Sequence, residues 1–456
     1  MAAPTRRKPL SRPRAALLTL GCAKNLVDSE HFASLLEAAG VEVCTDPARA
    51  RAVIINTCGF IDPAKEESID AILDIAALKG SGQVGAVIVT GCLSQRYAEE
   101  LRERIPEADA ILGIDPAGAA RAALRALGVA EGALPTRCNV RAHRLTPAAW
   151  SYLKIAEGCD NRCAYCAIPS IRGRLVSRPL EGLVREARFL LKSGVKELSI
   201  IAQDTTAYGM DRGRQELHVL LRRLCRLPGE KWVRLLYTHP AHFYPELMDV
   251  LASEPSLCPY LDIPLQHISD RILRGMGRKV TRADIERLIE RLRTRIPHLT
   301  LRTTFLVGFP GETERDFAEL LDFVRAVRFE RLGAFVYSRE EGTRAARLAR
   351  QVPKKVKEAR RHELMMLQKQ IARELAAARL GEKTRVLIEQ AASGRRPATR
   401  QAGKPAFGRS PHEAPDVDPV ILLPGARGLK PGQMVDVEIT GSAGYDCIAR
   451  VRHSPR

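Results

Sequence analysis

Three cysteines on one short loop constrain this chain more than any other feature of its sequence. Cys159, Cys163 and Cys166 follow the apolar run 152–156, so three thiols stand at i, i+4 and i+7 on a loop that leaves a predicted strand. A [4Fe–4S] cluster held only by protein takes four cysteine thiolates. This loop offers three, with no fourth cysteine nearby, and leaves one coordination position open, as a catalytic metal site requires. It therefore predicts an iron–sulfur cluster with an open iron.

Two other interpretations of this loop are a zinc site and buried cysteines that bind no metal. Structural zinc sites usually complete four ligands with C-x2-C pairs, so three cysteines at this spacing disfavour zinc. Four of the eleven cysteines stand in apolar or mixed contexts without a site-like spacing, and we expect them to be ordinary core residues: Cys44, Cys225, Cys258 and Cys447.

The composition is that of a globular protein with room for two or three domains in 456 residues. Hydrophobic residues make up 45% and charged residues 27% of the chain. No apolar run has the length that spans a bilayer, and the N-terminus has no apolar h-region of a signal peptide after its basic residues. We therefore expect a cytoplasmic protein that does not contact membranes, in which cysteines serve metal or redox chemistry more than disulfides.

The positive charge is concentrated at the two ends of the chain. Of the formal net charge of +19, residues 1–14 contribute +5, residues 339–380 contribute +7 and residues 381–456 contribute +4. This distribution favours a polyanionic partner such as RNA. The alternative is a solvated basic surface that serves solubility only.

The first 14 residues combine prolines with basic residues and are predicted to be a disordered tail. From residue 15 apolar runs alternate with helical patterns, which indicates a parallel sheet with helices on both faces. We expect strands at 15–20, 41–44, 52–56, 86–89 and 110–112, and helices near 29–39, 64–78 and 94–104. Residues near 113–148, rich in proline and glycine, are interpreted as the end of this domain and a connector.

Three of these strands end in a cysteine, namely Cys22, Cys58 and Cys92, each beside a glycine. The carboxyl ends of strands meet at one edge of an open α/β sheet, so thiols far apart in sequence can meet in space. Any one of them alone would more often be a core residue. Together they predict a second three-cysteine cluster site.

A second series of strands follows, at 152–156, 197–202, 233–237, 260–264, 301–307 and 332–337, with amphipathic helices between them such as 180–193 and 282–295. Six βα units resemble the partial barrel of the radical S-adenosylmethionine enzymes, so chemistry is expected at the carboxyl ends of the strands. Polar residues stand at those ends, where some will be helix caps and others ligand contacts: Gln203, Asp204, Thr205, Thr238, His239, Gln266, His267, Gly308, Gly311 and Glu312.

The C-terminal part divides into a helical stretch and a small β domain. Residues 339–380 are basic and helix-prone, and Met365 and Met366 are expected on the packed face of that helix. Short strands at 385–390, 397–401, 417–423, 434–440 and 446–451 predict a small antiparallel barrel of the OB type. With only Phe407 and Tyr445 as aromatics, the barrel is expected to bind through charge and shape and not by base stacking.

From about residue 15 to the end, the chain resembles the methylthiotransferases of the radical S-adenosylmethionine (SAM) superfamily. C-x-x-x-C-x-x-C with Tyr165 before the last cysteine is the loop pattern of that superfamily, and Cys22, Cys58 and Cys92 match the second cluster of the methylthiotransferases. The resemblance implies an N-terminal methylthiotransferase domain over 15–130, a connector over 131–147, a radical SAM domain over 148–380 and a TRAM domain over 381–456.

Several strings are similar to the RimO type, which thiomethylates an aspartate of ribosomal protein S12, and not to the branch that thiomethylates an adenosine of tRNA. The strings are GCAKNLVDSE at 21–30, NTCGFI at 56–61, AIPSIRG at 167–173, QD at 203–204, PLQH at 264–267, RTTFLVGFPGE at 302–312 and SREEG at 338–342. Tyr165, where RimO proteins often have phenylalanine, and the extra basic segment 1–14 depart from that pattern.

The resemblance implies two [4Fe–4S] clusters and SAM as cofactors. In the mechanism that the resemblance implies, the reduced cluster on the loop would cleave SAM to a 5′-deoxyadenosyl radical, which would take hydrogen from the aspartate β-carbon. Sulfur would then join that carbon from or through the second cluster, and another SAM would supply the methyl group. SAM contacts are expected at Tyr165, Gln203, Gln266, Gly308 and Glu312. Ribosomal protein S12 and an unidentified electron donor are the implied partners, and the basic linker and TRAM domain could also contact RNA.

Two other functions stay open from the sequence. One is thiomethylation of a tRNA adenosine, since the barrel and the basic linker suit either substrate. The other is a two-cluster electron carrier or a cluster-stabilised RNA-binding protein. An electron carrier would ordinarily supply four cysteines for each cluster and would not need a six-strand barrel.

Overall fold

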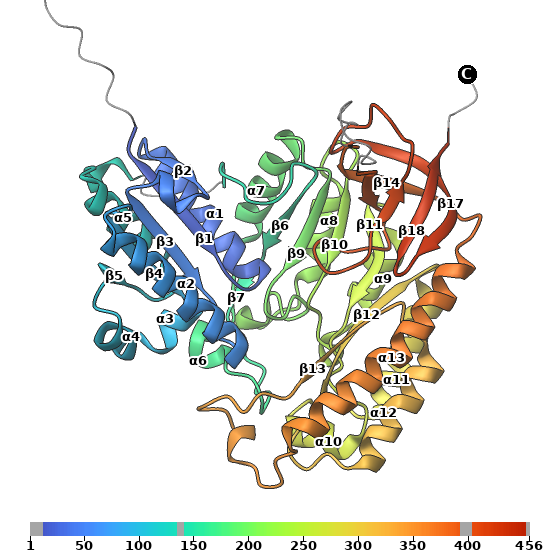
Figure 1. Cartoon of the computed structure of the whole chain (residues 1–456). Coiled ribbons are helices and arrows are strands. Elements are labelled where there is room, and N and C mark those ends of the chain that lie inside the picture. Colours follow the sequence, from blue (N-terminus) through green and yellow to red (C-terminus); the bar gives the residue numbers. More distant parts are fainter. Residues whose placement is uncertain (1–11, 135–140, 393–403, 453–456) are drawn as a thin grey trace, which may run out of the picture. The chain divides into compact units, whose positions relative to one another are not determined.

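The computed structural model describes residues 12–134, 141–392 and 404–452, which fold into two compact units (Figure 1). The first comprises the chain up to Leu145 together with Ser170–Arg172, and the second comprises Thr146–Pro169 and Gly173–Arg456. The domain boundaries within these units stay a prediction.

The first unit contains a five-stranded parallel sheet with the strand order β2-β1-β3-β4-β5. Its strands are β1 (Arg14–Thr19), β2 (Glu42–Cys44), β3 (Ala52–Thr57), β4 (Ala86–Gly91) and β5 (Ala110–Ile111). Its helices are α1 (Ala23–Ala38), α2 (Asp62–Gly80), α3 (Cys92–Arg96), α4 (Ala98–Arg104) and α5 (Pro116–Leu127), with 3₁₀ turns η1 (Pro47–Arg49) and η2 (Glu131–Ala133).

Helices cover both faces of this sheet, as the sequence predicts. Successive side chains of a strand point to opposite faces. Ile54 of β3 therefore packs with α1 and α5 in one core, while the neighbouring Ile55 packs with α2, α3 and α4 in another. Both residues are fully buried, so the sheet is the hydrophobic centre of the unit.

The structure differs from the predictions at two places in this unit. Arg14, expected in the tail, is the first residue of β1, because its backbone pairs with Glu42 of β2. The helix expected at 94–104 is divided at Tyr97 into α3 and α4. Most of the predicted tail, residues 1–11, lies outside the described residues.

Helix α5 was not predicted, because its residues were interpreted only as the proline- and glycine-rich end of the domain. Pro116 occupies the first turn, where the missing N–H costs nothing, and Gly128 ends the helix in the left-handed conformation at φ +69°. Alanines between these two residues pack closely on the sheet. The proline and glycine therefore mark the ends of a helix.

The second unit contains a six-stranded parallel sheet with the strand order β13-β12-β11-β10-β9-β6, which confirms the predicted partial barrel. Its strands are β6 (Trp150–Lys154), β9 (Glu197–Ile201), β10 (Trp232–Leu235), β11 (Leu257–Asp262), β12 (Thr300–Val307) and β13 (Arg331–Val336). A short hairpin of β7 (Ala156–Glu157) and β8 (Val176–Ser177) follows the first strand.

Helices follow the strands and bury one face against them (Figure 1). They are α7 (Leu180–Lys192), α8 (Leu217–Cys225), α9 (Pro245–Ser253), α10 (Asp270–Met276), α11 (Arg282–Arg295), α12 (Glu314–Val327) and α13 (Lys354–Ala378), with 3₁₀ turns η3 (Met210–Arg212), η4 (Pro240–His242) and η5 (Ala345–Arg347). The short helix α6 (Ile168–Arg172) is divided between the units, since Ser170–Arg172 belong to the first. Thr281 and Thr313 begin α11 and α12 with reciprocal capping boxes, which satisfy backbone donors that would otherwise lack partners.

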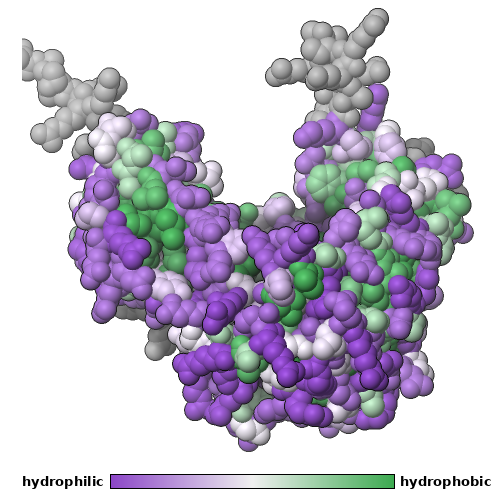
Figure 2. Space-filling model, turned by 60° about the horizontal axis from the view of Figure 1, so that its bottom comes forward, coloured by the Kyte–Doolittle hydropathy of each residue, from purple (hydrophilic) through white to green (hydrophobic). Residues whose placement is uncertain are grey.

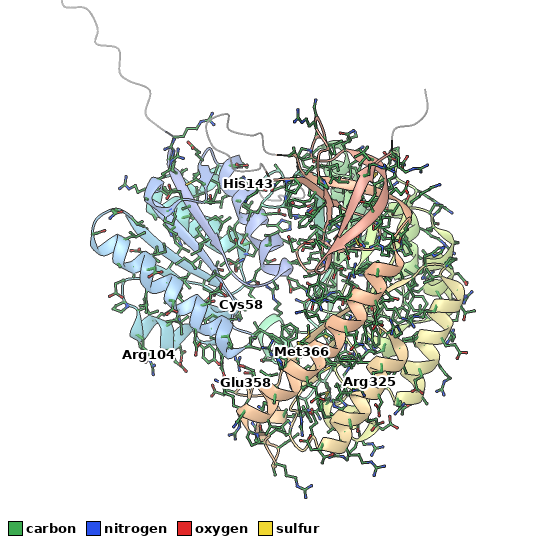
Figure 3. All side chains as sticks on the ribbon, turned by 45° about the vertical axis from the view of Figure 1, so that its right-hand side comes forward. Cys58, Arg104, His143, Arg325, Glu358 and Met366 are labelled. Atoms are coloured by element: carbon green, nitrogen blue, oxygen red, sulfur yellow. The ribbon has the colours of Figure 1, made fainter. Side chains whose placement is uncertain are left out.

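The basic stretch 339–380 is helical only from Lys354 onward, as α13. Met365 is partly buried against the core of the second unit, as expected. Met366, labelled on α13 in Figure 3, is 51% exposed, so the expectation that it packs in the core is wrong. The next residue along a helix lies about 100° around the axis, which turns Met366 away from the core.

The C-terminal strands close into a five-stranded barrel with the order β14-β15-β16-β18-β17, all but one pair antiparallel. They are β14 (Lys383–Gln390), β15 (Ala406–Arg409), β16 (Ile421–Leu423), β17 (Met434–Ala443) and β18 (Asp446–Val451). The strand expected at 397–401 lies outside the described residues, and β15, which no pattern predicted, completes the barrel.

Buried ion pairs hold this barrel to the strands of the partial barrel within the second unit. Arg409 of β15 donates to Glu197 of β9 at 2.9 Å, and Arg234 of β10 donates to the same carboxylate at 2.7 Å. Burial raises the pKa of Glu197, but the two arginines outweigh it and hold the pKa below its usual range. All three side chains are fully buried, so the barrel is an integral part of this unit.

The surface agrees with the charged composition. Figure 2 shows a face of the molecule on which hydrophilic side chains predominate, with smaller hydrophobic areas between them. Among the described residues, no helix has both the length and the apolar character needed to span a membrane.

Candidate functional site

The three-cysteine loop, in the second unit, lies between β7 and α6. It begins at Gly158, whose φ is +70° and where a Cβ atom would lie 2.0 Å from the carbonyl oxygen of Arg174. Only glycine fits such a close approach of two backbone segments. The sequence therefore turns sharply before Cys159 and leaves Cys159, Cys163 and Cys166 partly buried on one loop.

A small hydrophobic cluster fixes the middle of the loop. Ala164 is 3% exposed and packs with Met276 of α10, Phe309 and Tyr337, and Tyr165 packs against the same cluster. The backbone N–H of Ala164 donates to the carbonyl of Met276 at 2.8 Å. These contacts hold the loop in place through its backbone.

The thiols of this loop fit the requirements of an iron–sulfur site. Backbone N–H groups of Asn161 and Ile168 donate to the sulfurs of Cys159 and Cys166 at 3.4 and 3.5 Å. Burial raises the pKa of Cys159 to about 11 and that of Cys166 to about 12, so without a metal both thiols are protonated. Metal coordination removes such protons, and N–H groups aimed at sulfur stabilise the thiolates that result.

Residues from the ends of β9 and β10 gather at this loop, as expected for strand ends. The Gln203 side chain donates to Glu157 at 2.9 Å, and Asp204 accepts from Asn161, within the cysteine loop, at 2.7 Å. Asp204 also bonds the Nδ1 atom of His242 at 2.8 Å. Gln203 and Asp204 therefore lie beside the loop, as predicted, whereas the hydroxyl groups of Thr205 and Thr238 donate to the backbone carbonyls of Leu236 and Asp262.

The imidazole of His239 stacks on that of His242, with ring centroids 4.7 Å apart. Ligand atoms of Asp204, His239 and His242 lie within 4.8 Å of one another, but Asp204 is already engaged by Asn161 and His242. We therefore assign this group to the support of the loop. Asn161 and His242 were missed from the sequence because neither has a distinctive spacing.

The ends of β11 and β12 form the next part of the site. Gln266 lies in the left-handed region at φ +72°, where its backbone bridges to β12 through Thr304 and Leu306, both at 2.8 Å. A residue other than glycine in this region carries strain and is often found at functional sites. The structure thus holds Gln266 in an unusual conformation beside the strand ends.

Glu312 braces the loop that follows β12. Its Oε2 atom accepts from the N–H of Gly308 at 2.7 Å, and its Oε1 atom accepts from Arg360 at 2.9 Å. His267 is fully buried, with its Nε2 atom 3.7 Å from Glu312, and burial lowers its pKa to about 3, so the imidazole is neutral at pH 7.

The other three cysteines lie at the strand ends of the first unit. Cys22 precedes α1, Cys58 follows β3, where Figure 3 labels it, and Cys92 begins α3 after β4. A Cβ atom at Gly21 would lie 2.9 Å from the sulfur of Cys58. Glycine at position 21 therefore lets the loop before Cys22 approach Cys58 closely. The structure thus brings these loops together, as the strand-end argument predicts.

Asn25 ties these loops to one another within the first unit. Its side-chain amide donates to the carbonyls of Leu20 and Thr57, both at 2.9 Å, and its oxygen lies 3.6 Å from the sulfur of Cys92. Burial raises the pKa of Cys92 to about 11 and also raises that of Cys58. This second set of buried thiols also suits metal coordination, which would deprotonate them.

The remaining described cysteines do not complete either group. Cys225 and Cys447 are buried among hydrophobic residues, and Cys258 is buried beside the charged groups around Glu197, so these three are the buried residues that the sequence indicated. Cys44, at the end of β2, is only partly buried against the core.

Comparison with known proteins matches the three parts of the chain to three families. Residues 14–113 match Uncharacterized protein family UPF0004, residues 153–324 match the Radical SAM superfamily, and residues 380–451 match the TRAM domain. The chain is similar in fold to the radical SAM methyltransferase TsrM from Kitasatospora setae, with a TM-score of 0.53 and 18% identity over 71% of this chain and 73% of that one.

Two relatives that are similar along almost the whole chain are named ribosomal protein uS12 methylthiotransferase RimO. The protein from Desulforudis audaxviator is 46% identical over 96% of this chain and 97% of its own length. The protein from Porphyromonas gingivalis is 44% identical over 97% of this chain and 100% of its own. The chain therefore belongs to the RimO family of methylthiotransferases, within the radical SAM superfamily.

Proposed function

We propose that this protein transfers a methylthio group to the β-carbon of an aspartate of ribosomal protein S12. The observation that carries the proposal is the similarity to RimO proteins over nearly the full length of both chains. Two separate groups of three cysteines, the one on the loop with backbone N–H groups that donate to two of its sulfurs, agree with the chemistry that this reaction needs.

The cofactors follow from these groups. SAM and an iron–sulfur cluster belong to the radical SAM superfamily, and we assign a [4Fe–4S] cluster to Cys159, Cys163 and Cys166. We assign a second cluster to Cys22, Cys58 and Cys92. Bound clusters and SAM would supply the radical and sulfur chemistry that side-chain acids and bases cannot perform on an unactivated C–H bond.

The chain's own residues would position these groups. Gln203 reaches the start of the cysteine loop through Glu157, and Tyr165 lies on the loop itself, so both are proposed SAM contacts. Gln266 is a third. Glu312 holds the backbone of Gly308 in place, so its contribution to SAM binding would come through the shape of that loop.

The partners are proposed in the same way. The basic stretch 339–380 and the C-terminal barrel would approach the S12 substrate, alone or in the ribosome, where RNA is the neighbouring polyanion. An electron donor of unassigned identity would reduce the clusters.

The test separates the two substrate classes. Reconstituted protein, SAM and a reductant are incubated under anaerobic conditions with S12 in one reaction and with tRNA in another, and each product is analysed by mass spectrometry. We expect the mass of a methylthio group on one aspartate of S12 and unmodified tRNA. Modified tRNA with unmodified S12 would refute the proposal. A Cys163→Ala variant serves as the control that forms neither product.

A further inference from the structure

Arg278 is a buried cation that lacks a carboxylate partner among the described residues. Its side chain is 6% exposed, and no ion pair within 4.0 Å joins it to an acid in the part of the chain that the structure describes. Other buried arginines of the same unit have such partners: Arg234 pairs with Glu197 at 2.7 Å and Arg360 with Glu312 at 2.9 Å. Since an isolated buried charge is costly, Arg278 requires an anion that these contacts do not include.

The contacts of Arg278 indicate where that anion lies. Its Nη2 atom donates to the carbonyl of Pro264 at 2.6 Å, and its Nη1 atom donates to the sulfur of Cys163 at 3.7 Å. Its Nε atom is buried without a hydrogen-bond partner among the described residues. One edge of the guanidinium therefore faces the cysteine loop.

The backbone fixes this arrangement from both sides. Arg278 follows α10 after Gly277, which ends the helix at φ +72°, and its N–H donates to the carbonyl of Leu273 at 2.9 Å. The carbonyl of Met276, two residues earlier, accepts from Ala164 in the cysteine loop at 2.8 Å. The guanidinium and the Cys163 sulfur are thus held together by backbone contacts within a buried cluster.

The nearest competing acid is already engaged. Asp204 acts on Arg278 electrostatically, but its carboxylate accepts from Asn161, His242 and Thr206. A protonated Cys163 thiol carries no charge with which to balance the guanidinium. A thiolate does, and all three cysteines of the loop would be thiolates when they hold a cluster.

We propose that Arg278 is the counter-charge of the cluster on the cysteine loop, donating an N–H···S hydrogen bond to Cys163 and raising the reduction potential of that cluster. A fixed cation favours the reduced, more negative state, and hydrogen bonds to ligand sulfur act in the same direction. Arg278 therefore acts through the cluster, by favouring the reduction that begins the reaction, and does not itself touch the substrate. The inference depends on the proposed function only in assuming that this loop holds an iron–sulfur cluster.

The test compares Arg278→Gln with Lys279→Gln. Lys279 is the next residue and exposed, so its replacement removes the same formal charge where solvent screens it. Both changes are made in full-length protein in which Cys22, Cys58 and Cys92 are alanine, so that only the loop cluster contributes to the signal. The reduced fraction is measured by electron paramagnetic resonance at poised potentials, without SAM or substrate.

At the potential that reduces half of the parent's clusters, the reduced-to-oxidised ratio should fall about tenfold in Arg278→Gln, as expected for a nearby partly screened charge. It should change less than about twofold in Lys279→Gln, whose charge lies in solvent. Equal ratios in the two variants would overturn the proposal. Unchanged potential with weaker SAM binding in Arg278→Gln would also overturn it, because the arginine would then serve the carboxylate of SAM.

Arg278→Lys covers the case in which Arg278→Gln does not retain iron. The lysine keeps the charge and loses the planar fork. Iron retained by Arg278→Lys but lost from Arg278→Gln would support a role for the charge, whereas loss from both would show that the side chain serves packing and would overturn the proposal. Absence of iron from the parent would instead refute the cluster assignment on which the proposed function depends.

Discussion

Replacement of Arg409 by methionine tests whether buried ion pairs make the C-terminal barrel part of the second unit. The Arg409 side chain is fully buried and donates to Glu197 at 2.9 Å, to Glu389 at 2.7 Å and to the carbonyl of Glu413 at 2.8 Å. Arg409→Met leaves Glu197 with Arg234 but removes the cation beside Glu389.

The expected cost is that of breaking a buried pair by removal of one partner, about 3 to 5 kcal/mol. With the usual unfolding entropy per residue, each kcal/mol lowers the melting temperature of a unit of about 300 residues by roughly 1.5 °C, so the transition of the second unit should fall by about 5 to 8 °C. The measurement is a thermal melt followed by circular dichroism, with the urea midpoint as a second probe.

Arg450→Met is the matched control, because Arg450 belongs to the same barrel but is 75% exposed and 3.9 Å from Glu438. Its loss should cost less than about 1 kcal/mol. Adding Glu389→Gln to Arg409→Met should recover part of the loss, because burial already raises the pKa of Glu389 and its unpaired charge would be gone. Similar small shifts for Arg409→Met and Arg450→Met would refute the reasoning.

Two further predictions concern the turn before the cysteine loop and the dependence on pH. Gly158→Ala should lower the melting temperature more than Gly173→Ala. Both glycines have positive φ, but only at Gly158 would the new Cβ meet a carbonyl oxygen, at 2.0 Å. Equal shifts in melting temperature would contradict this prediction. Burial raises the pKa of Glu413, yet Arg379 and Arg331 outweigh it and bring the pKa to about 2. The unfolded chain, with a pKa of about 4.3, binds this proton first as pH falls, so about 3 kcal/mol of stability should be lost between about pH 4.5 and 2. Glu413→Gln should abolish that part of the pH dependence, which is measured as the urea midpoint at pH 6 and at pH 3. An equal fall of the midpoint in the wild type and in Glu413→Gln would refute this prediction.

The sequence was most informative where buried strands end in distinctive residues. The runs before Cys22, Cys58 and Cys92 are continuous and apolar, so the strands and the meeting of their ends could be predicted from the parallel-sheet pattern. The six strands of the second unit were found for the same reason.

The sequence was least informative about residues whose role depends on a contact with a distant part of the chain. Arg278 lies 115 positions from Cys163, and no local pattern distinguishes it from a surface arginine. No helix was predicted between Pro116 and Gly128 because both residues are typical of loops, although here they begin and end α5. Such assignments need the three-dimensional neighbours, which the spacing of residues does not supply.

Iron and acid-labile sulfide, measured in reconstituted wild type, Cys163→Ala and Cys58→Ala, test the central claim that two independent sites each use three cysteines. Two [4Fe–4S] clusters correspond to about eight iron atoms for each chain, and each variant should keep about four. A Cys225→Ala control, at a buried cysteine outside both groups, should keep about eight as well. Loss of all iron in one variant, or no loss in either, would contradict the account.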